Sequence, residues 1–378
     1  MIAKTARREF SRSIRLEEGS GTLLSRGVGE GSRLLYLHIP FCESLCTYCS
    51  FNRILFDESL ARQYFAALRR EITLYGERGY DFEGIYVGGG TPTVLMDELE
   101  ETLSHARTRF GIREISVETN PNHLTVKNIE ALRKVGVNRL SVGIQSFDDG
   151  LLKAMGRYNS YGSGNEIRER LINAKGYLDT LNADMNFNFP IQTSETLERD
   201  IDILKETEVD QVTYYPLMVS DSTRSAVERT LGRVDYRKER DFYHLISGRL
   251  TPRYHFSSAW CFSRKDAIID EYIVDYDDYA GLGSGSIGYL DGRCYANTFY
   301  IPEYIERLER GEIPLMASRE FSLQDRIRYD FVMKLFGMEL SLDALVEKYG
   351  RRALLCLFPD IAAFFCAGGL RYSGGALH

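Results

Sequence analysis

Three cysteines with the spacing C-x₃-C-x₂-C stand directly after a short apolar run of the chain. The run, residues 34–40, is rich in β-forming side chains and predicts a strand, so Cys42, Cys46 and Cys49 lie on the loop that leaves it. Thiolates this close together can converge on one metal centre, either a zinc ion or an iron–sulfur cluster. A structural zinc site needs four protein ligands, and the nearest further candidate is His38, inside the run. Three cysteines without an obvious fourth predict a cluster with one open iron, where a small molecule can bind.

The remaining cysteines and the charge balance are those of an ordinary globular protein. Four further cysteines are scattered between residues 261 and 366, which is not a disulfide framework and favours a cytoplasmic location. A net charge of −7 implies no general attraction to nucleic acid or to anionic lipid. No apolar run is long enough to span a membrane, and residues 1–30 lack the apolar core of a signal peptide. With 378 residues, the chain is long enough for a large core and two domains.

From residue 34 onward, short β-type runs alternate with amphipathic helical stretches. The runs predict strands over residues 34–40, 84–90, 114–120, 139–145, 183–189 and 211–217. The stretches between them predict helices over residues 59–75, 96–110, 125–135, 164–177 and 194–207. Consecutive βα units imply right-handed crossovers and a parallel sheet. Periodicity alone does not distinguish a doubly wound sheet from a partial barrel.

The two ends of the chain have a different character. Residues 1–33 are rich in Gly, Ser and Arg and predict an arm on the surface or over the opening of a site. Beyond about residue 225 the alternation stops, and residues 253–298 are aromatic, glycine-rich and irregular, with helices predicted over residues 241–250, 322–336, 341–349 and 351–365. We therefore expect an arm at 1–33, an alternating α/β unit at 34–225 and a smaller, mostly helical C-terminal domain at 226–378.

Polar or glycine-rich residues stand at the ends of most predicted strands. The second strand runs into Gly88-Gly89-Gly90-Thr91-Pro92, whose bare backbone can approach a ligand and offer N–H groups. The third ends at Glu118, which caps a helix or contacts a ligand, and the fourth ends at Gln145, whose amide both donates and accepts hydrogen bonds. Arg157 carries a guanidinium that can pair with a carboxylate in a fixed fork. That carboxylate belongs either to a ligand or to the protein surface. The pattern Gly283-x-Gly285-x₂-Gly288 is not a dinucleotide site, because it neither follows a βαβ strand nor precedes a suitable helix.

The string Tyr36-x-His-Ile-Pro-Phe-Cys42-x₃-Cys46-x-Tyr-Cys49 resembles the signature of radical S-adenosylmethionine (SAM) enzymes. It is similar to one branch of that superfamily, the oxygen-independent coproporphyrinogen III oxidase-like family, which also holds haem chaperones, anaerobic haem-degrading enzymes and class C methyltransferases. The resemblance is close over residues 34–217 and looser beyond them. It implies an open (β/α)₆ partial TIM barrel, a [4Fe–4S] cluster with SAM, a tetrapyrrole-like or polycyclic substrate, and an electron donor such as flavodoxin or ferredoxin.

The resemblance also implies a role for each strand-end residue. The three cysteines are expected to hold the cluster, and Gly89, Gly90 and Thr91 the amino group of SAM. Arg157 is expected to pair with the carboxylate of SAM, and Gln145 and Asp184 to contact its ribose. Glu118 and Tyr36 are further expected contacts with SAM.

The substrate half of the chain departs from the oxidase pattern. Oxidases carry one more cysteine in the motif, where this chain has Phe51, and residues 214–220 and 257–264 also differ. These departures predict a reaction other than decarboxylation of coproporphyrinogen and favour class C methyl transfer, with two SAM molecules close together. Tyr48 and Tyr215 are then the candidate catalytic residues. A coproporphyrinogen III oxidase, a haem chaperone and a zinc-stabilised binding module are the alternatives.

Overall fold

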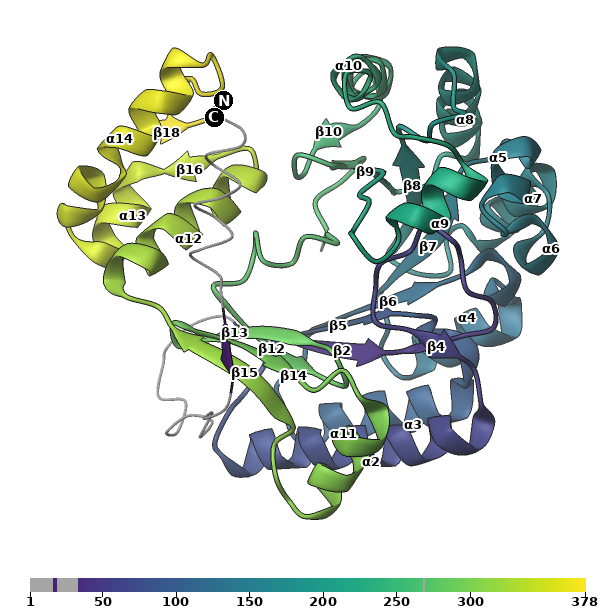
Figure 1. Ribbon diagram of the computed structural model, residues 1–378, viewed down its shortest axis with the longest axis horizontal. Coiled ribbons are helices and arrows are strands. Elements are labelled where there is room, and N and C mark those ends of the chain that lie inside the picture. The colour runs from purple at the N-terminus through teal and green to yellow at the C-terminus, as the bar shows by residue number, and fades with distance from the viewer. Residues whose placement is uncertain (1–15, 19–32, 268) are drawn as a thin grey trace.

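A computed structural model describes residues 16–18, 33–267 and 269–378 of the chain. One mixed sheet organises the fold, with the strand order β1-β15-β14-β13-β12-β2-β5-β6-β7-β8-β9-β11-β10. The strands from β2 to β9 in this order are parallel and follow one another in the sequence. Figure 1 shows them curving around an open interior, with helices along the outside. The predicted open (β/α)₆ partial barrel is therefore confirmed.

The parallel strands and their connecting helices begin and end close to the predicted runs, except for two short helices within residues 149–161 that the sequence did not predict. The strands are β2 (Arg33–Ile39), β5 (Gly84–Gly89), β6 (Glu114–Thr119), β7 (Arg139–Gln145), β8 (Thr180–Phe187) and β9 (Gln211–Pro216). The helices are α2 (Glu58–Glu77), α3 (Met96–Arg107), α4 (Val126–Lys134), α5 (Asp149–Ala154), α6 (Tyr158–Tyr161), α7 (Gly164–Ala174) and α8 (Ser194–Thr207), with 3₁₀ turns η1 (Pro92–Val94) and η2 (Pro121–His123). Side chains of Asp57, Thr125, Ser163 and Thr193 cap α2, α4, α7 and α8, which explains why these helices begin where they do.

Alternation along β2 shows how the barrel separates its core from its interior. Leu35, Leu37 and Ile39 are fully buried and belong to the main core, which also holds the apolar faces of the outer helices. Tyr36 and His38 point the other way, because successive side chains of a strand face opposite sides. Polar and aromatic residues thus line the inside of the barrel, where a site can form.

The sheet continues on both sides of the barrel, which the sequence did not predict. On one side β12 (Asp278–Leu282) pairs in parallel with β2, and antiparallel strands β13 (Ile287–Leu290), β14 (Arg293–Asn297), β15 (Leu315–Glu320) and β1 (Glu17–Glu18) follow. On the other side lie β11 (Cys261–Ser263) and β10 (His255–Phe256). The prediction that residues 253–298 are irregular is therefore wrong for β10 to β14, which lie within that range. They are too short, and too interrupted by glycine turns, to leave a period in the sequence.

The glycine pattern at residues 283–288 forms the turn of the β12–β13 hairpin. A Cβ atom at Gly283, whose φ is +100°, would lie 2.6 Å from the carbonyl oxygen of His38. The glycine is therefore required for close packing against the barrel. No helix follows the turn, which agrees with the rejection of a dinucleotide fingerprint.

One long connection crosses the open interior of the barrel. Residues 264–277 lead from β11, whose Ser263 pairs with Gln211 at the start of β9, to β12, whose Asp278 pairs with Arg33 at the start of β2. Figure 1 shows this segment running across the inside of the fold from one edge of the barrel to the other. We call the described part of this connection, residues 264–267 and 269–277, the crossing segment. It closes the end of the barrel opposite to the cysteine loop.

The remaining elements are mostly helical, as predicted. They are α9 (Arg224–Thr230), α10 (Glu239–Leu250), α11 (Ile301–Glu309), α12 (Leu323–Phe336), α13 (Leu342–Tyr349) and α14 (Arg352–Cys366), with a small sheet of β16 (Leu340–Ser341), β18 (Ala376–Leu377) and β17 (Tyr372–Ser373). The predicted capping box of Ser322 and Asp325 begins α12. Helices α12 to α14 form a second, smaller core around Phe331 and Leu357.

The domain boundaries at residues 33 and 225 stay a prediction. Most of the expected N-terminal arm lies outside the described residues, and its described part, β1, pairs with β15. Within the described parts of the chain, we find no helix whose length and apolar character would let it cross a membrane.

Candidate functional site

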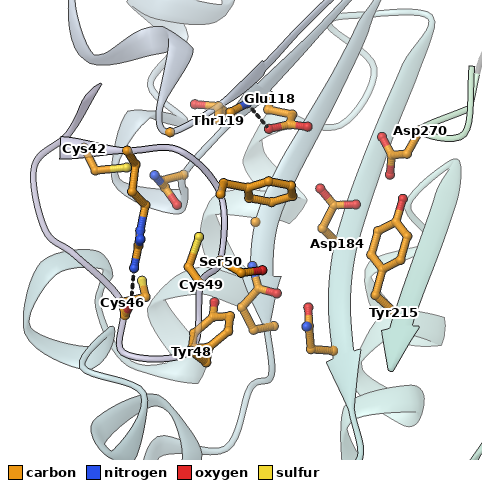
Figure 2. A pocket seen from close by; sticks show the side chains of 18 of the residues that line it. Cys42, Cys46, Tyr48, Cys49, Ser50, Glu118, Thr119, Asp184, Tyr215 and Asp270 are labelled. Atoms are coloured by element: carbon orange, nitrogen blue, oxygen red, sulfur yellow. Dashed lines mark hydrogen bonds between the residues drawn. The ribbon is translucent and has the colours of Figure 1, made fainter. Parts of the chain in front are cut away.

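The cysteine loop leaves the carboxyl end of β2 and is closed at its base by two short parallel strands, β3 (Phe41–Cys42) and β4 (Ile54–Leu55). The main-chain N–H of Ile54 donates to the carbonyl oxygen of Pro40 over 2.7 Å and holds the two ends of the loop together. Cys42 and Cys46 are buried, Cys49 is half-buried, and all three are free thiols. Figure 2 shows them on one side of a cavity, with Glu118, Asp184 and Asp270 on the other side.

The cavity has a volume of about 390 Å³ and lies at the carboxyl ends of the parallel strands. Side chains or backbone from the cysteine loop and from the strand ends surround it. The predicted site residues that line it are Tyr36, Cys42, Cys46, Tyr48, Cys49, Gly89, Gly90, Glu118, Gln145, Arg157, Asp184 and Tyr215. The remaining predicted residue, Thr91, lies immediately behind the lining. The fold thus brings together residues that are up to 179 positions apart in the sequence.

The glycine-rich turn packs against the cysteine loop more closely than the sequence predicted. A Cβ atom at Gly90 would lie 2.7 Å from the carbonyl oxygen of Phe41, so only glycine fits there. The N–H groups of Gly90 and Thr91 donate to carbonyl oxygens of the chain, and that of Gly89 donates to Glu118 over 3.1 Å. These donors are engaged within the protein. The glycines therefore serve close packing here, and the expected contact of Gly89, Gly90 and Thr91 with SAM stays a prediction.

A chain of buried hydrogen bonds connects Arg157 to two of the cysteines. The Arg157 guanidinium lies 3.5 Å from the sulfur of Cys46 and donates to Oδ1 of Asn120 over 3.0 Å. The amide of Asn120 donates to the hydroxyl of Thr91 over 2.8 Å, and that hydroxyl lies 3.6 Å from the sulfur of Cys42. Arg157 is only 5% exposed, so its charge acts in a site from which water is largely excluded. An anion bound in the cavity would meet a preorganised cation beside the thiols.

Three carboxyl groups share one guanidinium on the opposite side of the cavity. Arg139 is fully buried and lies 2.9 Å from Asp270, which the crossing segment brings into the barrel. The phenol oxygen of Tyr86 lies 2.6 Å from Asp270 and 3.1 Å from Glu118. The amide of Asn182 donates to Asp184 over 2.7 Å and to Asp270 over 3.3 Å.

Because three buried carboxyl groups lie near only one guanidinium, they differ in protonation. Burial by itself would raise the pKa of Asp270, but the Arg139 charge lowers it to about 2. Burial, and then the Asp270 charge, raise the pKa of Asp184 well above its usual range and that of Glu118 to about 7. Asp270 is therefore the ionised member, Glu118 carries a proton below about pH 7, and the raised pKa of Asp184 favours its protonated form. A cationic ligand would favour their ionisation.

Tyr36 and His38 form a fixed pair next to the cavity. The Tyr36 hydroxyl lies 3.0 Å from Nδ1 of His38, and Nε2 of His38 lies 2.8 Å from the carbonyl oxygen of Asn52. Both ring nitrogens are thus engaged, and burial lowers the pKa of His38 to about 4, which keeps the ring neutral. His38 orients Tyr36 and the end of the cysteine loop. It is not available as the fourth metal ligand that its position in the sequence allowed.

Aromatic and apolar side chains form the remaining wall and the mouth of the cavity. Tyr215 lines the cavity and packs edge-on against Trp260, with ring centroids 5.3 Å apart, and Trp260 packs against Phe336 of α12. Phe51 and Met218 also line the cavity and are 63% and 58% exposed. Exposed apolar side chains at the mouth of a polar cavity are typical of a ligand-binding surface.

Sequence reasoning missed several residues of the site. Asn120 follows Glu118 in a stretch that the sequence already singled out, and an amide after a buried strand end is a usable signal. Arg139 stands at the start of a buried strand, where a charge requires a buried partner. Asp270 and Tyr272 belong to a charged, aperiodic segment, which predicts an exposed loop and conceals their place in the barrel.

Comparisons of the sequence and of the fold with known proteins point to the same superfamily. The profile of the Radical SAM superfamily matches residues 36–163. The heme chaperone HemW of Lactococcus lactis is 30% identical over 341 residues, which cover 86% of each chain, and that of Bacillus subtilis is 28% identical over 89% of this chain and 91% of its own. Among solved structures, coproporphyrinogen III oxidase (HemN) of Escherichia coli superposes with a TM-score of 0.78 at 20% identity, over 98% of this chain and 94% of the other.

The match to HemW extends well beyond the cysteine motif, and the likeness to HemN extends over nearly the whole fold. The chain therefore belongs to the radical SAM superfamily, in the family that contains the heme chaperone HemW and the oxygen-independent coproporphyrinogen III oxidases.

Proposed function

We propose that this protein is a radical SAM enzyme that modifies a planar polycyclic or tetrapyrrole-like substrate at the mouth of its cavity. One observation carries the proposal: a single lining joins three thiols, an arginine and strand-end acids to exposed apolar side chains. The polar interior suits SAM, which carries a carboxylate, an ammonium and a sulfonium group. The apolar mouth, with Phe51 and Met218, suits the flat face of a ring system.

The cofactors of this family are a [4Fe–4S] cluster and SAM. Cys42, Cys46 and Cys49 are the residues proposed to hold the cluster. Among the described residues, no three His, Cys, Asp or Glu side chains converge closely enough to share one metal ion. A cubane cluster does not require such convergence, because each thiolate binds its own iron. When both cofactors are bound, they supply one-electron reductive cleavage of SAM and hence a reactive carbon radical.

The protein's own residues would bind and orient SAM. Arg157, already placed beside Cys46, would pair with the carboxylate of SAM and neutralise it. Asp184 and Gln145 would hold the ribose hydroxyls through hydrogen bonds. Glu118 would lose its proton when the cationic part of SAM lies close to it, and its carboxylate would then stabilise that charge.

Methyl transfer is the reaction we propose within this class. Phe51 stands where the resemblance places a further cysteine in oxidases, so an apolar ring occupies the cavity there. Tyr48 and Tyr215, which line the same cavity, would complete an aromatic wall for a second SAM molecule and the substrate. Tyr215 is backed by Trp260, so this wall is rigid.

Haem binding without turnover is the second candidate function. It is favoured by the relatives named heme chaperone HemW, which the chain matches over most of its length. The exposed apolar mouth would also accept a porphyrin face. A chaperone would use the same cavity but would leave its ligand unchanged.

Anaerobic reconstitution with iron and sulfide, followed by product analysis, tests the proposal. With dithionite, SAM and candidate ring substrates, including quinones and coproporphyrinogen III, methyl transfer yields S-adenosylhomocysteine, 5′-deoxyadenosine and a methylated product. Release of carbon dioxide from coproporphyrinogen III without S-adenosylhomocysteine would establish decarboxylation instead. Haem binding is followed separately through Trp260, the only tryptophan of the chain, whose fluorescence a bound porphyrin quenches. Tight haem binding with no SAM cleavage would favour the chaperone.

A further inference from the structure

A basic surface borders the cysteine loop on the outside of the protein. Helix α9 follows the last barrel strand, and the hydroxyl of Thr230 at its end lies 3.4 Å from the hydroxyl of Thr47. Thr47 stands between Cys46 and Cys49, so the end of α9 lies beside the cysteine loop (Figure 1). We call residues 224–240 the α9 surface.

The α9 surface is positively charged in an acidic protein. Residues 224–240 contain six Arg and Lys against three Asp and Glu, a net charge of +3, whereas the whole chain has −7. All six basic side chains are exposed. Among the described residues, no carboxylate lies within ion-pair distance of Arg229, Arg233 or Lys238. Arg224 and Arg237 are paired with Asp221 and Asp235. Arg229, Arg233 and Lys238 are therefore the charges that can attract an acidic partner over several ångströms.

Large apolar side chains are exposed around the same surface. Leu45 of the cysteine loop is 43% exposed and Tyr236 of the α9 surface 59%. Protein interfaces commonly combine a few apolar or aromatic contacts with a charged rim. The α9 surface therefore has both the charge that steers a partner and the apolar contacts that hold it.

We infer that the α9 surface is the docking site of an acidic one-electron carrier protein of the flavodoxin or ferredoxin type. The inference rests on the proposed function, because reductive cleavage of SAM consumes one electron in each event and the donor must come close to the cysteines. The docked carrier loses one electron and the cluster gains it, while no bond in this chain forms or breaks. Transient redox complexes of this kind have small interfaces and form by electrostatic steering, which agrees with the exposed basic side chains of the α9 surface.

Charge reversal with a matched control tests the inference. The variant R229E/R233E reverses two exposed charges of the α9 surface that have no carboxylate partner in the described part of the chain. The control R133E/K134E reverses two exposed charges in the last turn of α4, at the opposite end of the barrel. The probe is a bacterial flavodoxin, used reduced for stopped-flow reduction of the cluster and oxidised for binding to the cluster-free protein, at low and at high salt.

The α9 variant is expected to lose about tenfold or more in association rate at low salt, with the difference shrinking at high salt. The control should stay within about twofold of wild type, and dithionite should reduce all three proteins alike. Equal rates for both variants would overturn the docking site while leaving the proposed function intact. Tighter binding of nucleic acid than of flavodoxin to the wild type would overturn it too. Failure of every protein, wild type included, to hold a cluster or cleave SAM with dithionite would instead contradict the proposed function.

Discussion

Replacement of Arg157 by lysine is expected to weaken SAM binding without removing the positive charge from the cavity. In the structure the guanidinium reaches Cys46, Asn120 and the carbonyl oxygen of Gly143 at once, and it stacks 4.2 Å above the ring of Tyr161. These contacts fix the plane of the guanidinium and engage both N–H groups of Nη2, so a carboxylate of SAM would receive a charge-assisted hydrogen bond from a remaining N–H of this fixed group. A lysine ammonium is a point charge that cannot reproduce that geometry.

The expected loss follows from this one hydrogen bond. Lysine keeps the charge but cannot hold an N–H in the same fixed position, and one charge-assisted bond contributes about 1.5–3 kcal/mol. The dissociation constant of SAM should therefore rise about 10- to 150-fold. Arg157 is only 5% exposed, so added salt should change the ratio of the two dissociation constants little.

Equilibrium dialysis of SAM against anaerobically reconstituted protein measures the effect. Because Arg157 also contacts Cys46, iron content is determined for each preparation and binding is expressed per cluster. Arg170→Lys is the matched control, since Arg170 donates to the carbonyl oxygen of Tyr161 but does not line the cavity. An unchanged dissociation constant for the Arg157 variant at equal cluster content would refute the carboxylate contact.

Three further outcomes are expected. Cys49→Ala should abolish iron binding after reconstitution, measured by iron analysis, and retention of a full cluster would exclude this thiol as a ligand. Asp270→Asn should destabilise the fold by less than the ~3–5 kcal/mol expected for an uncompensated buried Arg139, because Asp184 can ionise in place of Asp270. In urea unfolding, only the double variant D184N/D270N should show the full loss of stability. Equal losses for the single and the double variant would contradict this exchange of charge between the two acids. Burial raises the pKa of the fully buried Glu71 from 4.5 in its unfolded state to about 7. Its contribution to the free energy of unfolding is therefore complete below pH ~4.5 and is lost, by ~3 kcal/mol, as the pH rises through 7. Glu71→Gln should flatten the pH dependence of the free energy of unfolding over that window.

Sequence reasoning located the βα units and most of the cavity because their signals are local, whereas the partial barrel was implied by the family resemblance. Each strand of the barrel is a short apolar run bounded by turn residues, and each outer helix has one apolar face, so their periods could be read directly. Strand-end residues such as Glu118 and Gln145 then fall at one edge of any parallel sheet, whatever its curvature. The cysteine spacing, four and then three residues apart, is likewise contained in one short segment.

The rest depended on contacts between distant parts of the chain. Asp270 pairs with Arg139 across 131 residues, and neither the crossing segment nor its acids has a local pattern that reveals a buried position. The same contact determines which acid of the cavity is charged, because burial and a neighbouring guanidinium act in opposite directions on a carboxyl pKa. The sequence by itself determined the βα order and the residues that gather at the strand ends. Only the tertiary structure decided that β12 extends the sheet, that the crossing segment closes the barrel and that one arginine serves three acids, since these follow from long-range packing that no short window of sequence contains.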